Sequence, residues 1–348
     1  MTYTHTGRII KMTGGLYTVR LDPAGEALGG TPAETPAESA ENPLAGHIVD
    51  CRARGNFRHE HTTPLVGDRV LLQYDDSSYT SEDGGQVIPS TDGTGIMISE
   101  ILPRKNSLIR PPLANLDMML VVVAAASPDP DIPTIDKLLT ILEYNNIEPI
   151  MVIGKSELKP KRSAKIAALY EKIGYRTFVL SCYTGEGVQA FADFAHSELK
   201  GKITAVAGAS GAGKSTLLNT VFPGLDLVTG DISEKIGRGK NTTRHTELFD
   251  LPEWDGTPPG EARGYIADTA GFSLLDFERF DFFTLEDLPH TLREFTPYLG
   301  KCRYTDCMHI SDEGCAILEA VQKGDIPRTR HEAYKELYAT LREKKKYK

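Results

Sequence analysis

The spacing of hydrophobic positions divides the chain into regions of different structure. Residues 1–112 contain short runs in which apolar or β-branched residues alternate with polar ones, with turn residues between the runs. The runs read GRIIKM, LYTVRL, HIVDCRA, DRVLLQY and GIMISEIL. About five short strands of this kind predict a small all-β barrel. Two polar stretches, residues 23–46 and 75–85, interrupt the pattern and predict loops that bury little surface.

A different pattern begins at residue 113. Apolar runs such as MLVVVAAA, EPIMVIG and KITAVAG alternate with runs of helical periodicity such as IDKLLTILEYNN and SAKIAALYEKIG. This βαβ alternation predicts a parallel sheet with helices on both faces. Residues 276–348 favour helices around a cluster of cysteines. We therefore expect three domains: a β-barrel at 1–112, an α/β domain at 113–275 and a mostly helical subdomain at 276–348.

The segment GASGAGKST follows the strand-like run ITAVA and precedes LLNTVF, which can continue a helix. It fits the pattern of a loop that surrounds phosphates with backbone N–H groups at the start of a helix. Lys214 is placed to reach the terminal phosphates, and Ser215 is placed to bind Mg²⁺. The predicted nucleotide-binding residues are Gly208, Ala209, Ser210, Gly211, Ala212, Gly213, Lys214, Ser215 and Thr216.

Two downstream segments supply other parts that such a site needs. The run GYIADTAGF predicts a strand ending at Asp268, which places a carboxylate near Mg²⁺ and the Gly271 N–H near the γ-phosphate. A polar segment at 237–248, GRGKNTTRHTEL, lies between the phosphate loop and this strand. A threonine in this segment would complete the Mg²⁺ shell and become ordered by the γ-phosphate. Thr242 and Thr243 both fit, and Thr243 is favoured.

The element that identifies the base precedes the phosphate loop. In Ras-like GTPases an Asn-Lys-x-Asp element after a strand reads guanine, and a turn after the next strand supports it. Here the run EPIMVIGKSEL supplies the first element, and VLSCYTGEGV supplies the turn. The resulting order of motifs is a circular permutation of the usual GTPase order. The predicted base-site residues are Gly154, Lys155, Ser156, Glu157, Ser181 and Cys182.

Three of the five cysteines lie close together near the C-terminus. With one histidine they provide four ligands, enough for a closed tetrahedral Zn²⁺ site with a structural role. Cys51 and Cys182 stand alone, so the cysteines do not form a disulfide framework. The predicted zinc ligands are Cys302, Cys307, His309 and Cys315.

The charge balance argues against a simple basic nucleic-acid-binding protein, because the 348 residues carry a formal net charge of −9. Four stretches are nevertheless basic: 51–61, 103–110, 237–245 and 328–348. Each is either a solvated face or a contact for phosphates. Taken without the other motifs, the N-terminal pattern favours a barrel or sandwich that has no nucleic-acid role.

The chain shows no sign of membrane insertion or export. Its first residues lack the charged start and apolar core of a signal peptide. Its longest apolar run, MMLVVVAAA, is too short to cross a bilayer. We therefore expect a cytoplasmic protein without a membrane segment.

These motifs, in this order, resemble the RsgA (YjeQ) family of circularly permuted GTPases. The likeness rests on ILPRKNSLIRPPLANLD, GASGAGKST, RGKNTTRHTEL, DTAGF and the cysteine cluster. It implies an N-terminal OB-like barrel that binds RNA, a central permuted P-loop GTPase domain and a zinc-binding helical subdomain. It also implies hydrolysis of Mg²⁺-bound GTP to GDP and phosphate, stimulated by the small (30S) ribosomal subunit during its late maturation. The implied partners are GTP or GDP and the subunit with its rRNA, and the free protein is expected to be monomeric.

Several positions depart from the family pattern. Gly154 and Glu157 stand where the family usually has Asn or Thr and Asp, which weakens the polar contacts to guanine. Asn241 replaces a histidine proposed to help position the attacking water, and Asn can orient water without accepting a proton. DTAG replaces the commoner DTPG. Phe272 then stands where Ras-like enzymes carry a water-positioning Gln, which fits slow intrinsic hydrolysis.

These departures leave two other functions open. One is a nucleotide-gated RNA-binding assembly factor with negligible hydrolysis. The other is an NTPase with relaxed base specificity. In the favoured GTPase interpretation, Lys214, Thr243, Asp268 and Gly271 position the phosphates, Mg²⁺ and water, with Asn241 as a further candidate and no established general base.

Overall fold

The chain forms two compact units. One consists of Met1–Leu116 with Gly237–Ala270, and the other of Asp117–Ile236 with Gly271–Lys348. The three-domain division expected from the sequence stays a prediction. None of the helices described is long and apolar enough to cross a membrane. The computed structural model describes residues 2–23, 44, 46–58, 62–75, 79–81, 87–89, 95–108, 112–223, 225, 247–251, 264–268 and 284–346.

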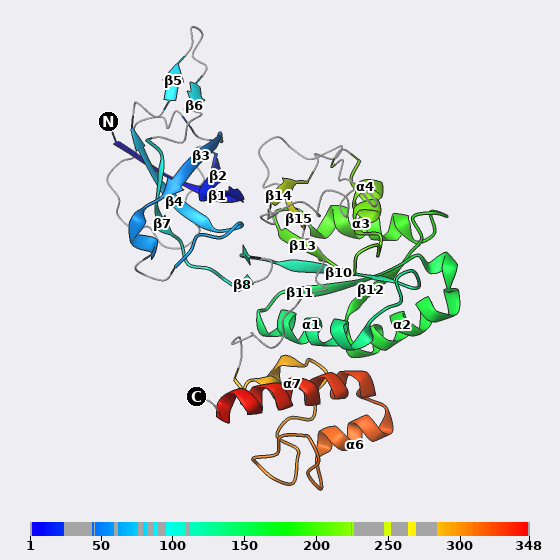
Figure 1. Ribbon diagram of the computed structural model, residues 1–348. Helices are drawn as coiled ribbons and strands as arrows, with labels where there is room; N and C mark the ends of the chain where they lie inside the picture. Colours follow the sequence, from blue (N-terminus) through cyan, green and yellow to red (C-terminus); the bar gives the residue numbers. More distant parts are fainter. Residues whose placement is uncertain are drawn as a thin grey trace. The chain divides into compact units, whose positions relative to one another are not determined.

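Within the described part of the first unit, five strands close into a barrel (Figure 1). They are β1 (Thr2–Thr13), β2 (Leu16–Leu21), β3 (Ile48–Ala53), β4 (Arg69–Asp75) and β7 (Met97–Ile101). β1 pairs with β2 and β4, β2 pairs with β3, and β7 pairs with β3 and β4, so the ring is complete. Buried and partly exposed residues alternate along β2 and β4, because one face of each strand points into the core. Each of the five predicted runs forms one of these strands, which confirms the barrel.

Short strand pairs extend the first unit. β5 (Tyr79–Ser81) pairs with β6 (Val87–Pro89), and β8 (Ser107–Leu108) pairs with β9 (Leu113–Ala114). The prediction of a loop throughout residues 75–85 was therefore wrong at β5, which forms a hairpin with residues beyond that stretch. The predicted loop at 23–46 falls almost wholly outside the described residues.

The strand leading to Asp268 is packed with the barrel in the same unit. β14 (Glu247–Asp250) pairs with β15 (Tyr265–Asp268), and it also pairs with β1. Lys11 Nζ lies 2.8 Å from Glu247 Oε2, and Arg20 forms an ion pair with Asp250. These contacts fix the β14–β15 hairpin against the edge of the barrel.

The second unit is built on a parallel sheet with helices on both faces, as predicted. The strand order is β12-β11-β10-β13, and all three neighbouring pairs are parallel. Figure 1 shows α1 and α2 on one face of this sheet and α3 and α4 on the other. The strands are β10 (Met118–Ala124), β11 (Glu148–Gly154), β12 (Arg176–Val179) and β13 (Ile203–Ala207). The helices are α1 (Ile132–Tyr144), α2 (Pro160–Ile173), α3 (Val188–Glu198) and α4 (Lys214–Val221).

Local sequence explains where these elements begin and end. β10, β11 and β13 are buried along nearly their whole length, so their sequences are continuously apolar rather than alternating. The Asp131 side chain accepts a hydrogen bond from the Thr134 N–H and caps α1. α2 starts with Pro160 at its first position and ends before Gly174, which adopts the left-handed conformation.

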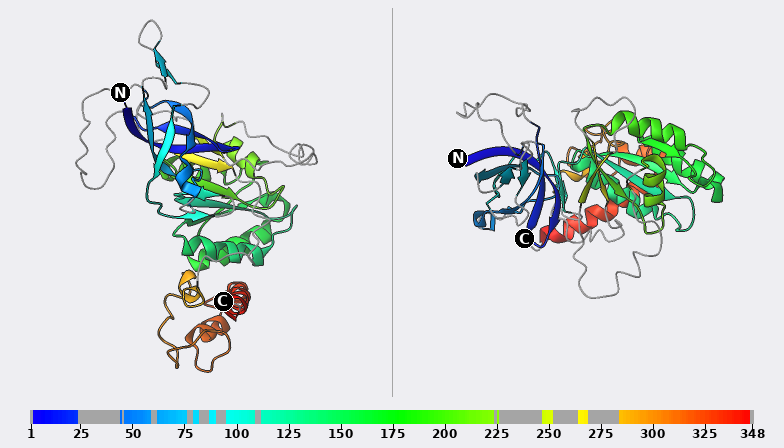
Figure 2. Two further views of the ribbon diagram at one scale, coloured as in Figure 1. Left: turned by 60° about the vertical axis from the view of Figure 1, so that its left-hand side comes forward. Right: turned by 90° about the horizontal axis from the view of Figure 1, so that it is seen from above.

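The C-terminal part of the second unit packs on α1. It contains α6 (Ala316–Lys323) and α7 (Arg328–Lys346), and α7 lies along α1 on the face of the sheet away from α3 (Figures 1 and 2). Arg330 of α7 is completely buried. Its Nε donates to Glu294 Oε1 at 2.6 Å, and its Nη1 donates to the Asp136 carbonyl at 2.6 Å. A buried guanidinium must be paired in this way, so Arg330 anchors the zinc-cluster region to the sheet layer.

Two arginines from the basic stretches are therefore not available to RNA phosphates. Arg330 is enclosed in the interior, although the sequence placed it in the basic stretch 328–348. Arg104, from the stretch 103–110, donates from Nε and Nη2 to the two carboxylate oxygens of the buried Asp68, each at 2.7 Å. The number of basic residues in a stretch thus overstates the charge that it can offer to a partner.

Candidate functional site

The phosphate-loop segment forms a tight turn between β13 and α4. Gly208 has a φ of +154°, and a Cβ atom built there would lie 2.3 Å from the Val122 carbonyl oxygen. Gly211 and Gly213 have φ values of +74° and +98°, which L-residues with side chains rarely adopt. A side chain is disfavoured at each of these positions, so glycine occupies them. Because the turn carries no Cβ atoms there, its backbone N–H groups stay accessible to a ligand.

Lys214 and Ser215 occupy the first turn of α4. The Lys214 ammonium donates to the carbonyl oxygens of Gly208 and Ala209, at 3.0 and 3.1 Å. The charge is thus held over the loop. Ser215 is partly exposed and Thr216 is exposed. The N–H groups of a first helical turn lack intrahelical acceptors, so this end of α4 favours an anion.

The base element and its supporting turn lie at the ends of adjacent strands. Lys155 follows β11 with a φ of +54°, and its Nζ donates to the carbonyl of Ser127. The Ser156 N–H donates to the Leu180 carbonyl at 3.3 Å, which ties the base element to the strand end before the turn. The carboxyl ends of parallel strands meet at one edge of a sheet, and β13 brings the phosphate loop to that same edge.

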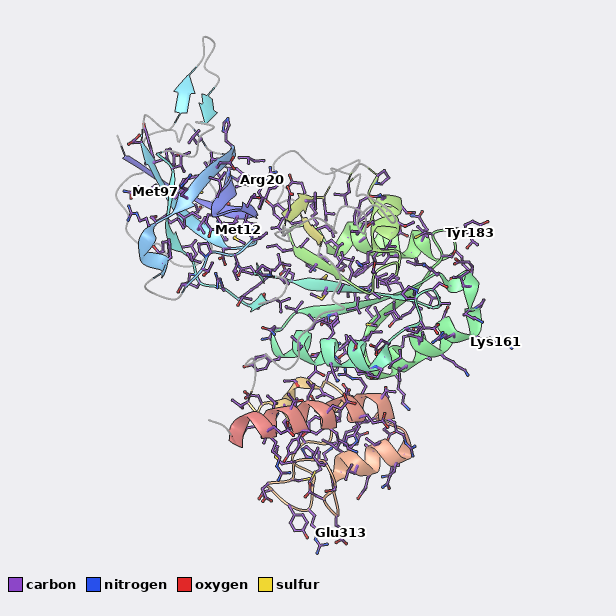
Figure 3. All side chains as sticks on the ribbon, in the orientation of Figure 1. Met12, Arg20, Met97, Lys161, Tyr183 and Glu313 are labelled. Atoms are coloured by element: carbon purple, nitrogen blue, oxygen red, sulfur yellow. The ribbon has the colours of Figure 1, made fainter. Side chains whose placement is uncertain are left out.

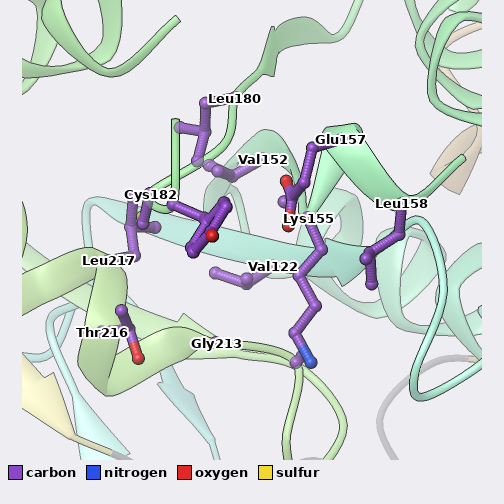
Figure 4. Close-up of a pocket in the computed structure, with 13 residues that line it drawn as sticks. Val122, Val152, Lys155, Glu157, Leu158, Leu180, Cys182, Gly213, Thr216 and Leu217 are labelled. Atoms are coloured by element: carbon purple, nitrogen blue, oxygen red, sulfur yellow. The ribbon is translucent and has the colours of Figure 1, made fainter. Parts of the chain in front are cut away.

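A cavity of about 300 Å³ joins the two elements (Figure 4). In Figure 4, Lys155 and Glu157 lie across this cavity from Cys182 and Leu217. One carboxylate oxygen of Glu157 is buried and has no hydrogen-bond partner within the described residues. The cavity is lined by Val122, Val152, Gly154, Lys155, Glu157, Leu158, Leu180, Cys182, Tyr183, Ala212, Gly213, Thr216 and Leu217.

The electrostatics of the cavity suit a ligand that donates hydrogen bonds. Glu157 provides a carboxylate acceptor without a protein donor on its buried oxygen. Burial raises the pKa of the Cys182 thiol; a hydrogen bond with Thr220 opposes this effect, and the charge of Glu157 adds to it. The thiol is therefore neutral at pH 7 and does not repel a carbonyl oxygen of a ligand.

Gly154 leaves part of the cavity open. Its φ lies outside the left-handed region, and a Cβ atom there would meet only the Ala212 carbonyl oxygen, at 3.7 Å. That distance is an ordinary van der Waals contact, so neither the backbone nor the packing requires glycine. Because Gly154 has no side chain, a gap remains between the base element and the phosphate loop.

The remaining predicted nucleotide-site residues lie wholly or partly outside the described part of the chain. Asp268 ends β15, as the sequence predicts, but its side chain is not described. Asn241, Thr242, Thr243 and Gly271 lie outside the described residues. Their roles stay predictions.

The four predicted zinc ligands converge. Their candidate ligand atoms all lie within 4.8 Å of one another. His309 Nδ1 lies 3.5, 3.4 and 3.5 Å from the sulfurs of Cys302, Cys307 and Cys315, and the Cys302 and Cys315 sulfurs are 3.9 Å apart. In a tetrahedral Zn²⁺ site with bonds of about 2.3 Å to sulfur and about 2.0 Å to nitrogen, ligand atoms are about 3.5–3.8 Å apart. The cluster therefore fits a four-coordinate zinc site with no position left for a substrate.

Neighbouring groups hold this cluster in shape. His331 Nε2 lies 2.8 Å from the His309 carbonyl oxygen, and the Tyr334 hydroxyl donates to the Met308 carbonyl at 2.7 Å. The Leu318 N–H points to the Cys315 sulfur at 3.5 Å. Contacts of this kind orient metal ligands, so the packing of α6 and α7 supports the zinc site.

Sequence reasoning missed several residues of the nucleotide site, and two of them are polar or aromatic residues that matter for binding. Ser127 accepts the hydrogen bond from Lys155, and Tyr183 lines the cavity. Ser127 carries no motif, so nothing in the sequence indicates its role. Tyr183 directly follows Ser181 and Cys182, and its position beside the supporting turn was a usable signal.

Comparison with known proteins gives a consistent result. The profile of the RsgA GTPase family matches residues 101–278, and that of the RsgA N-terminal domain matches residues 44–80. The small ribosomal subunit biogenesis GTPase RsgA of Geobacillus kaustophilus is 40% identical over 304 residues, which cover 86% of this chain and 92% of that protein. The protein of the same name from Agathobacter rectalis is 37% identical over 344 residues, covering 98% of this chain and 100% of that protein.

Solved structures of similar fold extend over nearly the whole chain. YjeQ from Thermotoga maritima aligns with a TM-score of 0.68 at 28% identity, covering 97% of this chain and 99% of that one. YloQ, described as a circularly permuted GTPase, aligns with a TM-score of 0.64 at 28% identity, covering 98% and 96%.

Proposed function

This chain belongs to the RsgA GTPase family, and from that premise we propose that it hydrolyses GTP to GDP and phosphate in the late maturation of the small ribosomal subunit. The subunit stimulates the reaction, and the nucleotide state switches the affinity for the subunit and its rRNA. The free protein is monomeric and cytoplasmic.

One observation carries the nucleotide part of this proposal. A single cavity is lined both by the phosphate-loop residues Ala212, Gly213 and Thr216 and by the base element with Lys155 and Glu157. Among the described residues, no donor reaches the buried carboxylate oxygen of Glu157, and guanine presents two donors, at N1–H and the exocyclic amino group. Adenine presents an acceptor at N1 instead. The cavity therefore favours guanine.

The phosphates would lie on the loop at the start of α4. There the N–H groups of the loop and the Lys214 ammonium stabilise the charge that develops on the γ-phosphate and on the leaving GDP. Ser215 would hold the Mg²⁺ that accompanies GTP. Water forms the new bond to the γ-phosphorus as the bond to the β–γ bridging oxygen breaks, and the proton that the water loses leaves with the released phosphate.

The switch residues complete the reaction centre in this proposal. Thr243 and Asp268 would help Ser215 to hold Mg²⁺, which would neutralise charge on the phosphates. The Gly271 N–H contacts the γ-phosphate, and Asn241 orients the attacking water by hydrogen bonding. Asn241 cannot accept a proton efficiently at pH 7, which fits slow turnover in the absence of the subunit.

The zinc site has a structural role. Four protein ligands fill its coordination shell, so the metal supplies no Lewis acid to the reaction. It holds the loop from Lys301 to Gly314, on which Arg303 and Tyr304 are exposed. This loop, the barrel and the exposed side of α7 are the proposed contacts to the subunit.

The test is a steady-state assay of GTP and ATP hydrolysis, with and without purified 30S subunits. We expect slow GTP turnover alone, a marked increase with 30S subunits and little ATP turnover in either case. Absence of any stimulation by 30S subunits would overturn the proposal. If GTP analogues changed subunit binding while turnover stayed negligible, the protein would instead be a nucleotide-gated assembly factor.

A further inference from the structure

One aromatic side chain at the nucleotide cavity packs little against the described part of the protein. Tyr183 is 89% exposed, more than any other large hydrophobic side chain in the described residues. In Figure 3 it projects from the end of the sheet, away from the ribbon. Exposing a tyrosine to this extent contributes nothing to the core, yet the same residue lines the cavity that holds Lys155 and Glu157.

The turn that carries Tyr183 is tightly held. The Ser181 N–H donates to the Glu186 carbonyl at 2.9 Å, and the Gly185 N–H donates to the Ser181 carbonyl at 2.8 Å. The Thr184 N–H donates to the Ser181 hydroxyl at 3.1 Å. Gly187 closes the turn with a φ of +72°, and a Cβ atom there would lie 2.1 Å from the Val179 carbonyl oxygen. The backbone at Tyr183 is therefore fixed, and the side chain has two rotatable bonds with which to reach a ligand.

Lys155 and Tyr183 approach the cavity from two different turns. Lys155 is fixed by its left-handed backbone and by its hydrogen bond to Ser127, so its aliphatic stem covers one side of the cavity. Tyr183 lines the cavity from the turn after β12. A planar base between them would have an aliphatic stem on one face and an aromatic ring on the other.

We propose that Tyr183 stacks on the base of the bound nucleotide, on the face opposite Lys155, and closes the cavity over it. This inference rests on the proposed function and adds a residue to its binding site. Stacking on an aromatic ring depends little on which base is bound, because every base has a π face. Tyr183 therefore raises affinity without selecting guanine, and it offsets the contact that Gly154 cannot make.

The stacking is tested by isothermal titration of wild-type protein and of Tyr183→Ala and Tyr183→Phe with Mg²⁺-GDP. Loss of one base–aromatic stack is expected to raise the Kd of Tyr183→Ala by about 5- to 100-fold. Tyr183→Phe keeps the ring and should bind within about twofold of wild type. The side chain is exposed, so both variants should fold normally, which circular dichroism and the melting temperature will check.

Inorganic tripolyphosphate is the matched probe without a base. Its Kd is expected to be the same for wild type and Tyr183→Ala, because the phosphate loop is untouched. An equal loss of affinity for tripolyphosphate and GDP would overturn the stacking. An unchanged Kd for GDP in Tyr183→Ala would also overturn the stacking. If that variant weakened only binding to 30S subunits, the ring would belong to a subunit-binding surface instead. Failure of wild-type protein to bind GDP would instead overturn the proposed function.

A spectroscopic signature separates stacking from a general effect on the pocket. The chain has one tryptophan, Trp254, so Tyr183→Trp in a Trp254→Phe background carries a single indole at the cavity. GDP should change the emission of this indole, and tripolyphosphate should leave it unchanged. Emission that is insensitive to GDP at saturating concentration would contradict the contact.

Discussion

The two ends of the nucleotide cavity recognise their ligand by different means. At the phosphate end, Gly208, Gly211 and Gly213 allow a backbone conformation in which N–H groups and the start of α4 face the ligand. At the base end, side chains carry the recognition, and Glu157 has a buried carboxylate oxygen that meets no hydrogen-bond partner in the part of the chain that the structure describes. Backbone recognition needs only that glycine occupy the strained positions, whereas side-chain recognition changes with each substitution.

The two ends therefore differ in how far their residues can change. Gly154 is not required by its backbone, and its missing side chain leaves a gap beside Ala212. Glu157 is one methylene longer than the aspartate that it replaces, and the open cavity can accommodate that length. The phosphate end thus supplies affinity for any nucleoside polyphosphate, and the base end supplies the preference among bases.

Loss of the phosphate end should have the largest effect. Lys214→Ala removes the charged donor that lies over the loop, and we expect GTP turnover to fall by about 100-fold or more. The affinities for GDP and for ADP should fall by a factor that is the same for both nucleotides, since both present phosphates. Single-turnover hydrolysis and titration measure the two effects. Lys161→Ala, at an exposed lysine of α2, is the control and should behave as wild type. If Lys214→Ala lost affinity for GDP but not for ADP, the phosphate end would not act equally on both nucleotides.

Loss of the base end should have a smaller and selective effect. Glu157→Ala removes the acceptor for guanine, and breaking hydrogen bonds to a charged group should weaken GDP binding by about 10- to 100-fold. ADP binding should stay the same, because adenine cannot donate from N1. Titration with both nucleotides measures the change in their ratio. Glu186→Ala removes an exposed carboxylate from the neighbouring turn and should leave both constants unchanged. An equal loss for GDP and ADP would show that Glu157 holds the pocket together rather than reading the base.

Restoring an amide at the base end should give the smallest effect, and it should be a gain. Gly154→Asn places a side chain in the gap beside the Ala212 carbonyl. From there the new amide can donate a hydrogen bond to the bound guanine. One neutral hydrogen bond of about 1 kcal/mol predicts about a fivefold lower Kd for GDP. Gly154→Ala fills space without adding a donor and is the matched control. Weaker GDP binding by Gly154→Asn than by Gly154→Ala would mean that the gap serves another purpose.

The sequence predicts those parts of the molecule that depend on local patterns. The five barrel strands and the βαβ alternation follow from hydrophobic periodicity, and each predicted run is a strand or helix of the structure. The phosphate loop is evident because glycine is needed at its strained positions. The zinc cluster can be predicted because its four ligands are close in sequence, and three cysteines and a histidine at this spacing are typical of a zinc site.

The rest depends on contacts between distant segments. Nothing near Ser127 in the sequence indicates that its backbone carbonyl accepts a hydrogen bond from the Lys155 ammonium. The two residues meet because each follows one of the adjacent strands β10 and β11. Arg330 resembles a surface residue of a basic helix, yet Glu294 and the Asp136 carbonyl enclose it. The open space at Gly154 and the exposure of Tyr183 likewise follow from the packing around them.

We propose that this chain selects guanine through an altered base element in which the Glu157 carboxylate accepts the hydrogen bonds of the base. The most direct measurement is titration of the wild-type protein with Mg²⁺-GDP and Mg²⁺-ADP under the same conditions. We expect GDP to bind at least about 10-fold more tightly than ADP, because guanine donates hydrogen bonds to the charged acceptor and N1 of adenine does not. Equal dissociation constants for GDP and ADP would contradict it.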